Sequence, residues 1–435
     1  MTVHNQKPAA DSLGPMLTAL LGDPLPVRFE FWDGTAVGAD AVSAEHTVIV
    51  RSPDAVRRIM WAPGELGFAR AYVCGDLDTD GSVADTLRAL QKAMPGSIAV
   101  AATALPAVAS AARSTGVFAA PPTAPPEEVV PRGLRHSVRR DRQAVSHHYD
   151  VGNDFYRIVL GPAMTYSCAR FVTDDTTLVD AQAAKHDLIC RKLGLADDSV
   201  RSASTSPRPR LLEVGCGWGS MALHAAAHYD VDVVGVTIST EQAALARQRV
   251  AEAGLDDRIE IRIQDYREVD DGPFDAISSI GMAEHVGAKN MQLYFSQLYG
   301  LLRDGGRLLN HAIASVGGSQ MSSRSFVGRY VFPDGELIDL ADTISAMEHA
   351  EFEVRDVENL REHYATTLRH WVANLEEQWD DAVRLVGERR ARVWLLYMSG
   401  SINGFDDNGL QLYQTLGVKS VRLPSGMAPT RRDWG

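Results

Sequence analysis

The second half of the chain alternates short apolar runs with amphipathic segments, which is the pattern of strands separated by helices. Helical spacing is clear in the segment 290–306, where Met291, Phe295, Leu298 and Leu302 share one face. This alternation predicts an α/β domain with a mostly parallel sheet and helices on both faces, which binds ligands at the carboxyl ends of its strands. The strands are expected at 210–216, 231–239, 259–265, 274–281 and 306–314.

The pattern before residue 90 is different. The segment "VRFEFWDGTAVG" at 27–38 predicts a hairpin with Asp-Gly as its turn, and "HTVIVRS" at 46–52 predicts another strand. Ser52 is an N-cap candidate for a helix over 52–61. We expect a small mixed α/β unit, and no catalytic constellation is visible in it.

A proline-rich stretch separates these two patterns. Residues 117–133, "VFAAPPTAPPEEVVPRG", contain five prolines and are typical of an extended linker. The chain has 435 residues, which is too long for one ordinary core. We therefore expect an N-terminal domain at 1–116, a linker at 117–133 and a second domain at 134–435.

The segment between Lys92 and Arg113 carries no charge and is long enough to span a bilayer. It is dominated by Ala, Gly, Ser and Thr, and Pro95 and Pro106 interrupt it. Because small residues contribute little to insertion, the composition favours a helix at a domain surface, in loose contact with lipid at most.

The C-terminal region contains a helical stripe made by Trp371, Leu375 and Trp379. Such a stripe is typical of core packing, or of the lining of a tunnel for an apolar chain. The glycines that follow predict a loop at 400–409.

Composition and charge narrow the class of protein to which the chain can belong. The chain is 45% hydrophobic and 23% charged, as globular proteins are, and its net charge of -13 argues against nucleic acid as a partner. A local basic patch at 130–142 is a solvated linker or a membrane-docking segment. The four cysteines show no metal spacing, so no metal site is expected. The start lacks a signal-peptide pattern, and we expect a cytoplasmic protein with reduced thiols.

A glycine-rich turn follows the first strand of the second domain. "LLEVGCGWGS" at 211–220 places Gly215, Gly217 and Gly219 between a predicted strand and a predicted helix. The spacing is G-x-G-x-G and not the G-x-G-x-x-G of dinucleotide sites, and no Walker lysine follows. The turn therefore suits S-adenosylmethionine, whose amino-acid end passes close to the backbone.

Polar side chains at the other strand ends extend this site. The second strand ends in "GVTIS" without the Asp or Glu that usually meets ribose hydroxyls, so Thr237, Ser239 and Gln242 are the groups on offer. Asp265 and Tyr266 end the third strand and are placed to meet the adenine. Each polar residue taken alone is as compatible with simple solvation, and their joint position favours a cofactor site.

Several ordered motifs resemble a known family. They include "HHYDVGNDFYRIVLGPAMTYSCARF", "LLEVGCGWGSMALHAA", "GVTISTEQ", "IGMAEHVG", "LLNHAI", "YVFPDGEL" and "EHYATTLRHW". From about residue 135 to 400 the chain is similar to cyclopropane fatty acid synthases and mycolic acid methyltransferases. The residues before the linker resemble the small N-terminal domain of the full-length phospholipid enzymes. The resemblance implies a class I S-adenosylmethionine-dependent methyltransferase fold for the second domain.

The resemblance also implies a reaction. The methyl group of S-adenosylmethionine would go to the cis double bond of an unsaturated phospholipid acyl chain, and a base would remove a proton so that a cyclopropane ring closes. In the family a bound bicarbonate is that base. The positions that match its pocket are Cys168, Glu284, His311, Ile313 and Tyr364. Glu284, His311 and Tyr364 would use side chains, and Cys168 and Ile313 mainly backbone groups.

Each of these assignments has a plainer alternative. Glu284 could cap a helix, His311 could be a satisfied core histidine, and Cys168 has no evident base that would make it a nucleophile. Tyr149 and Tyr166 are candidates to stabilise a cation with their ring faces, or to pack against the acyl tail. The residues expected to bind the cofactor are Tyr166, Ser167, Gly215, Gly217, Gly219, Thr237, Ile238, Ser239, Gln242, Asp265, Tyr266, Ile280 and Gly281.

Two other functions stay open. One is an alkene methyltransferase that leaves a methyl or methylene branch without closing a ring. The other is a non-catalytic lipid- or nucleotide-binding protein on the same scaffold, which five matching pocket positions disfavour. The resemblance to the full-length enzymes implies a homodimer. The extra N-terminal domain and the lack of an expected spanning helix predict a peripheral protein that visits the inner face of the membrane. Acyl chain length, head group and double-bond position do not follow from the sequence.

Overall fold

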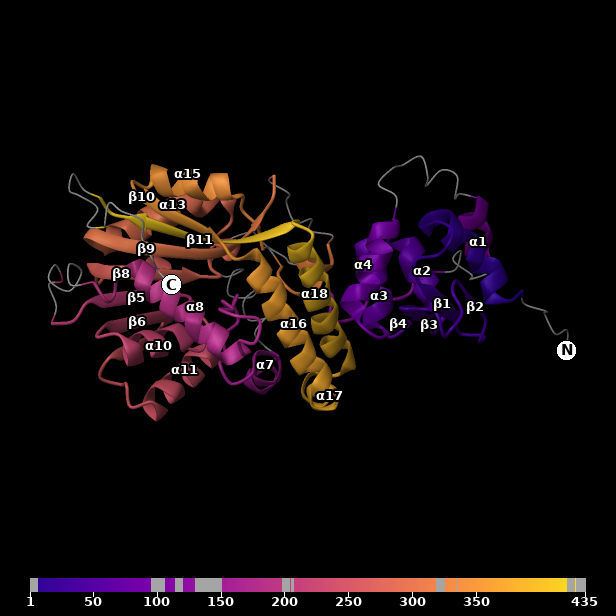
Figure 1. Ribbon diagram of the computed structural model, residues 1–435, viewed down its shortest axis with the longest axis horizontal. Helices are drawn as coiled ribbons and strands as arrows, with labels where there is room; N and C mark the ends of the chain where they lie inside the picture. Colours follow the sequence, from indigo (N-terminus) through magenta and orange to yellow (C-terminus); the bar gives the residue numbers. More distant parts are fainter. Residues whose placement is uncertain are drawn as a thin grey trace. The chain divides into compact units, whose positions relative to one another are not determined.

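The computed structural model describes residues 7–94, 106–113, 120–129, 151–197, 204, 207–317, 325–333, 335–420 and 427 (Figure 1). The chain forms two compact units. Unit 1 comprises Met1–Val130, Ser322–Pro333 and Trp379–Asn403, and unit 2 comprises Pro131–Met321, Asp334–Gln378 and Gly404–Gly435. The expected limits at 116 and 133 stay a prediction about functional domains.

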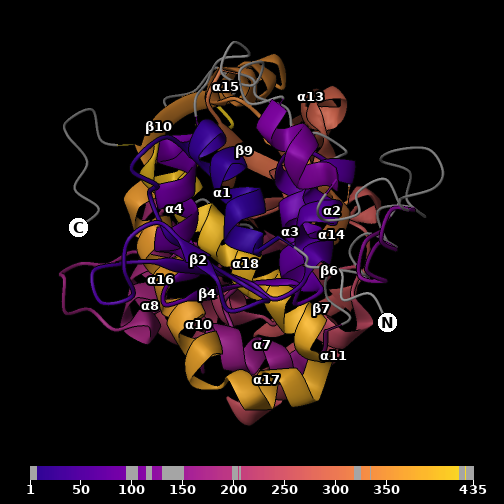
Figure 2. The ribbon, with the colours of Figure 1, turned by 90° about the vertical axis from the view of Figure 1, so that its right-hand side faces the viewer.

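Unit 1 is built on a four-stranded sheet in the order β2-β1-β3-β4. The expected hairpin is present, because β1 pairs antiparallel with β2. Ser52 caps α2 as expected, and its side chain accepts a hydrogen bond from the Asp54 N–H at 3.1 Å. Figure 2 faces this unit and shows α1, α3 and α4 beside the strands. Its elements are α1 (Ala9–Leu21), β1 (Arg28–Phe31), β2 (Ala36–Val37), β3 (Thr47–Val50), α2 (Pro53–Trp61), α3 (Glu65–Val73), β4 (Leu77–Asp80), α4 (Val83–Ala93), α14 (Phe326–Tyr330), α17 (Trp379–Val386) and most of α18 (Glu388–Asp406).

Polar contacts join the late segments of unit 1 to its early ones. The Arg392 guanidinium forms an ion pair with Asp78 at 2.9 Å. The Asn403 amide donates to the Ala84 carbonyl at 2.9 Å and accepts from the Arg88 side chain at the same distance. Because these groups are largely buried, α18 is part of the core of unit 1 although it lies more than 300 residues away in the sequence.

Unit 2 contains a seven-stranded sheet in the order β10-β11-β9-β8-β5-β6-β7. The strands from β9 to β7 are parallel to one another, as expected, and β11 runs antiparallel between β9 and β10. The strands are β5 (Arg210–Val214), β6 (Asp232–Thr237), β7 (Ile259–Ile263), β8 (Phe274–Ile280), β9 (Leu302–Ser315), β10 (Glu353–Asn359) and β11 (Leu410–Val418).

Helices cover both faces of this sheet, which confirms the predicted fold class (Figures 1 and 2). One core cluster joins α8, α10 and α11 to one face, and a second joins α13 and α15 to the other. The four apolar residues predicted to share a face at 290–306 are all buried. The helices of unit 2 are α7 (Asn153–Leu160), α8 (Leu178–Leu193), α10 (Ser220–His228), α11 (Thr240–Glu252), α12 (Ala283–Val286), α13 (Met291–Leu301), α15 (Leu340–His349) and α16 (Arg361–Glu377), with short 3-10 turns at Tyr266–Glu268 and Ala288–Asn290.

The loop predicted at 400–409 is wrong for most of its length. Helix α18 continues to Asp406, through Gly400 and Gly404. Burial of Ile402 and Phe405 and the hydrogen bonds of Asn403 hold the helix where the local glycines would have ended it. None of the helices in the described part of the chain is both long and apolar enough to cross a membrane.

The contacts of Asn403 predict its contribution to stability. In Asn403→Ala the Ala84 carbonyl and the Arg88 side chain lose a buried partner, which costs about 1–3 kcal/mol. Chemical denaturation should show this loss. The control is Gly400→Ala on the same helix, whose added methyl group meets no atom within 4 Å and should leave stability unchanged or slightly raised. Equal stability of both variants would contradict the role of Asn403.

Candidate active site

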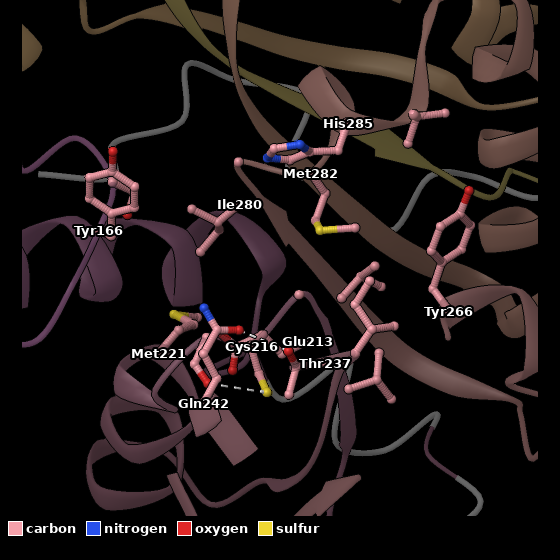
Figure 3. Close-up of a pocket in the computed structure, with 18 of the residues that line it drawn as sticks. Tyr166, Glu213, Cys216, Met221, Thr237, Gln242, Tyr266, Ile280, Met282 and His285 are labelled. Carbon is pink, nitrogen blue, oxygen red and sulfur yellow. Dashed lines mark hydrogen bonds between the residues drawn. The ribbon is translucent and has the colours of Figure 1, made fainter. Parts of the chain in front are cut away.

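A cavity of about 260 Å³ opens at the carboxyl ends of β5, β6 and β8. Strand order reverses at β5, because β6 and β7 lie on one side of it and β8 and β9 on the other. Open parallel sheets bind ligands at such a switch point. In Figure 3, Tyr166 and Tyr266 lie on opposite sides of the opening, with Glu213, Thr237 and Gln242 between them.

The glycine turn forms part of the cavity wall. Gly215, Gly217 and Gly219 have φ angles of 76°, 53° and 78°, which L side chains rarely adopt. A methyl group on Gly215 would collide with the Met282 thioether, whereas one on Gly217 would meet no protein atom within 4 Å and would enter the cavity space. Gly219 does not line the cavity. It begins α10, and a methyl group there would lie 3.3 Å from Ala246.

The end of β6 supplies polar groups without an acid. Thr237, Ile238 and Gln242 line the cavity, and the Thr237 hydroxyl donates to the Gln242 side-chain oxygen at 2.9 Å. Ser239 lies outside the lining. Its hydroxyl accepts from the Gln242 N–H at 3.2 Å and so caps α11. The side-chain nitrogen of Gln242 is the donor that remains for a ligand when its side-chain oxygen accepts from Thr237.

Residues after the end of β7 form another part of the wall. Asp265 is buried, and its two carboxylate oxygens accept from the Arg267 guanidinium at 2.9 and 2.7 Å. Tyr266 packs edge-on against Tyr294, with ring centroids 5.0 Å apart. The Arg267 guanidinium thus compensates the charge of Asp265, and Tyr294 holds the ring of Tyr266 in place beside the cavity.

The remaining predicted cofactor residues also line the cavity. The Tyr166 ring lies between Tyr156 and Trp371, with centroid distances of 5.7 and 5.4 Å. Ile280 and Gly281 come from the end of β8. Ser167 accepts a hydrogen bond from the Lys185 ammonium at 2.9 Å. Tyr149 and the basic patch at 130–142 lie outside the described residues.

Sequence reasoning missed several residues of the lining. Lys185, Glu213, Met282 and His285 all face the cavity. Glu213 could have been found, because an acid inside an apolar strand just before the glycine turn must be buried near the ligand. Lys185 gave no such signal, since a lysine in an amphipathic helix ordinarily points to solvent.

A chain of contacts connects the five residues predicted to form the second pocket. The Ile313 N–H donates to the Glu284 carboxylate at 2.7 Å, and His311 lies two residues earlier on β9. Leu412 on β11 pairs with Ile313, and its carbonyl accepts from the Leu360 N–H at 2.9 Å. The Leu360 carbonyl in turn lies 3.6 Å from the Cys168 thiol and accepts from the Tyr364 N–H at 3.2 Å. The structure therefore brings all five to one region of unit 2, and their roles stay predictions.

Burial shifts the pKa values of three of these five residues. It raises the pKa of Glu284 to about 7, against which the Ile313 N–H acts only in part. It lowers the pKa of His311 well below the ordinary value, so the imidazole is neutral, and raises that of the Cys168 thiol. Two buried atoms, Glu284 Oε2 and His311 Nε2, have no hydrogen-bond partner among the described residues. Such orphaned atoms are typical of a polar ligand site.

No group of three or more His, Cys, Asp or Glu side chains in the described ranges is arranged to hold a metal ion. The glycine turn at the switch point of a mostly parallel sheet, lined by polar strand ends and aromatic rings, defines the class of S-adenosylmethionine-dependent methyltransferases. The chain belongs to the mycolic acid cyclopropane synthetase family, whose model matches residues 136–415.

Individual relatives agree with this membership. A "probable fatty acid methyltransferase" of Mycobacterium tuberculosis is 42% identical over 94% of this chain and 95% of its own length, and one of Pseudomonas putida is 38% identical with the same coverage. The cyclopropane-fatty-acyl-phospholipid synthase of Escherichia coli is 37% identical over 63% of this chain and 67% of its own.

A solved structure matches a large part of the chain. The mycolic acid cyclopropane synthase CmaA1, complexed with SAH and CTAB, superposes with a TM-score of 0.59 at 33% identity. The match covers 64% of this chain and 98% of that one. Family and fold predictions from the sequence are thereby confirmed.

The glycine geometry predicts the effect of a side chain on cofactor binding. In Gly217→Val the branched side chain would occupy the cavity, so S-adenosylmethionine affinity should fall at least about 100-fold in calorimetric titration. The control is Gly254→Val, which has the same sign of φ and open space but lies after α11, away from the cavity lining. This variant imposes the same kind of backbone strain without placing a side chain at the cavity, so it should bind S-adenosylmethionine normally. Wild-type affinity in a folded Gly217→Val protein would contradict this location for the ligand.

The pKa of Glu284 predicts a pH-dependent stability difference. Its folded-state pKa of about 7 lies above the ordinary 4.5, so the wild-type protein loses stability as pH rises from about 4.5 to 7, by up to about 1.4 kcal/mol per unit. Glu284→Gln keeps an oxygen for the Ile313 N–H and removes this titration. Its stability relative to wild type should therefore increase between pH 5 and 7.5 and then level off in denaturation curves. An unchanged difference across this range would contradict burial of the carboxylate.

Proposed function

We propose that this protein transfers the methyl group of S-adenosylmethionine to the cis double bond of an unsaturated phospholipid acyl chain and closes a cyclopropane ring. The observation that carries the proposal is the chain of contacts that connects Glu284, Ile313, His311, Cys168 and Tyr364, together with the buried atoms Glu284 Oε2 and His311 Nε2, which lack a partner among the described residues. Family membership supports the methyl transfer, and the pocket supports the later removal of a proton.

The cavity residues would hold the cofactor as follows. The backbone at Gly215 and Gly217 would hold its amino-acid end, the side-chain amide of Gln242 would bind the ribose, and Tyr266 would hold the adenine; all four residues line the cavity. When bound, S-adenosylmethionine supplies the methyl group. Because an alkene is a weak nucleophile, the contribution of the protein is to hold the double bond in line with that methyl group, and such positioning supplies several kcal/mol, about 7–11 at best.

The second pocket has the groups that a small anion needs. Glu284 Oε2 and His311 Nε2 are buried and lack a partner within the described structure, and the Ile313 N–H fixes the other carboxylate oxygen. With its pKa near 7, Glu284 is ionised in part at neutral pH, so Oε2 would accept a hydrogen bond from the hydroxyl group of bicarbonate, and neutral His311 would present Nε2 to the same ligand. Glu284, His311 and Tyr364 would hold bicarbonate, and bicarbonate when bound would supply the base that accepts the proton released by ring closure.

Aromatic rings complete the environment. Tyr166 and Trp371 pack against each other, and Tyr364 packs edge-on against Trp371 at 6.0 Å. Their ring faces can stabilise positive charge on the acyl chain without reacting with it. The Cys168 thiol stays protonated because burial raises its pKa, so it does not compete for the methyl group as a nucleophile.

A second candidate function has its own support. The two relatives that match along 94% of this chain are named fatty acid methyltransferases, not cyclopropane synthases. That naming favours a methyl or methylene branch as the product. The five matching pocket positions favour ring closure because they are those of the ring-closing family, although a methylene branch would release one proton as well.

The remaining proposals concern the setting of the reaction. The substrate would be phospholipid in a bilayer, reached by a homodimer that contacts the inner face of the membrane peripherally from the cytoplasm. The N-terminal domain would contribute to lipid contact. Higher turnover on phospholipid vesicles than on free fatty acids would support these proposals, and equal turnover would count against them.

Substitutions in the second pocket test the chemistry. Glu284→Gln and His311→Ala should each lower turnover about 10- to 100-fold, because each removes a partner of a bound anion, while S-adenosylmethionine affinity stays near normal. The control is Cys168→Ser, in which a hydroxyl can still donate to the Ala169 and Leu360 carbonyls, so activity should stay high. An inactive Cys168→Ser together with a fully active Glu284→Gln would replace the anion model with a thiol-dependent one.

The product decides between the two candidate functions. A cyclopropane and a methylene branch have the same mass, so we expect NMR of lipids from a host lacking such an enzyme to show ring protons after expression. Methylene or methyl signals in place of ring protons would establish the branching reaction. Loss of ring protons in the Glu284→Gln strain would tie the product to this pocket.

A further inference from the structure

The short helix that carries Glu284 has little support of its own. Helix α12 is about one turn long, and a helix of that length is unstable in isolation. Gly287 ends it with a φ angle of 83°. The carbonyls at the end of the helix therefore need partners from elsewhere in the chain. The position of the Glu284 carboxylate depends on the residue that supplies them.

Glu336 takes the place of the next helical turn. In a continuous helix the Ala288 N–H would donate to the Glu284 carbonyl. Here the Glu336 N–H donates to the Glu284 carbonyl at 2.9 Å, and the Ala288 N–H donates to the Glu336 carboxylate at 2.8 Å. The backbone of Glu336 thus satisfies the acceptor of the interrupted hydrogen bond, and its side chain satisfies the donor. One residue fixes both sides of the turn that follows Glu284.

The segment around Glu336 is itself anchored in unit 2. The hydroxyl of Ser315, the last residue of β9, donates to the Leu337 carbonyl at 3.1 Å. Ile338 is buried in the same apolar cluster as Val286 of α12. These contacts join the segment to β9 and to the helix, so Glu336 has a fixed base from which to hold α12.

We propose that Glu336 is a positioning residue for the second pocket, because it holds the turn after Glu284 and with it the carboxylate that accepts from the Ile313 N–H. This inference rests on the proposed function, which places removal of the proton in that pocket. Glu336 belongs to the segment "YVFPDGEL" at 330–337, to which the proposed reaction assigns no role. It acts through α12 and touches neither cofactor nor substrate.

Two substitutions at this position test the hydrogen bond. With vesicles of dioleoylphosphatidylglycerol as substrate, Glu336→Ala should lower kcat roughly 5- to 20-fold and change the KM for S-adenosylmethionine less than about twofold. The loss is moderate because the backbone donor to the Glu284 carbonyl remains. Glu336→Gln keeps an acceptor oxygen for Ala288 and should retain at least about half of the wild-type kcat. Equal losses in both variants would overturn the inference.

The control is Asp339→Ala on the same segment. It also removes a carboxylate that accepts from a backbone N–H, that of Ala341 at 2.7 Å, but this contact caps α15 and not α12. Asp339→Ala should lower the free energy of unfolding and leave kcat unchanged. If it lowered kcat as much as Glu336→Ala, general loosening of the segment would explain the loss, and the inference would fall.

Hydrogen–deuterium exchange reads the position of Glu284 without any substrate. The Ile313 and Ala288 amides donate to the carboxylates of Glu284 and Glu336. In peptides that contain them, both amides should exchange at least about tenfold faster in Glu336→Ala, and neither should change in Asp339→Ala. Unchanged exchange at Ile313 in Glu336→Ala would overturn the inference whatever the activity.

A double substitution separates this role from a merely structural one. Because Glu336 acts through Glu284, adding Glu336→Ala to Glu284→Gln should lower kcat less than about twofold further. Fully additive losses would overturn the inference. A fully active Glu284→Gln would instead overturn the proposed function of the pocket. A fully active Glu336→Ala beside an impaired Glu284→Gln would overturn this inference alone.

Discussion

The hydrogen-bonded position of β9 is the constraint on which the candidate site depends. This strand pairs with parallel β8 on one side and antiparallel β11 on the other, so its backbone register is fixed from both edges. The Gly281 N–H donates to the His311 carbonyl at 2.8 Å, and the Ile313 N–H donates to Glu284. A one-residue slip would turn His311 to the opposite face and remove the amide that orients the carboxylate. The contact between Ile313 and Glu284 thus depends on both neighbouring strands holding β9 in one register.

Ionisable side chains are buried in the same region, and their burial costs free energy. Burial shifts the pKa values of four side chains in the direction that favours the neutral form. These side chains are Glu284, His311, Lys185 and Glu213. Apolar residues at these positions would avoid the cost of burying ionisable groups. The apolar clusters on both faces of the sheet stabilise the fold and offset this cost. Buried polar groups that lack partners are one physical sign of a site shaped for a ligand.

Unit 1 depends on segments that lie far apart in the chain. Its sheet comes from the first 80 residues, but Asp78, Ala84 and Arg88 find their partners on α18. Removal of the N-terminal residues would expose Arg392 and Asn403 as well as delete a sheet. The effect of such a truncation on lipid turnover would combine lost lipid contact with lost packing, so single substitutions separate these contributions more clearly.

The sequence by itself determined the elements of unit 2 and the location of its site. Alternating apolar runs and three glycines in a short turn depend on local backbone and side-chain preferences, which act wherever the chain goes, and Ser52 as the cap of α2 in unit 1 has the same local origin. Tertiary structure alone decided the rest. Helix α18 continues through two glycines because Asn403 and its apolar neighbours are buried. Ser239 and Gly219 are the N-cap residues of α11 and α10 and lie outside the cavity lining. Lys185 reaches the cavity only because α8 packs across β8 and β9, a contact between distant segments that no local pattern encodes.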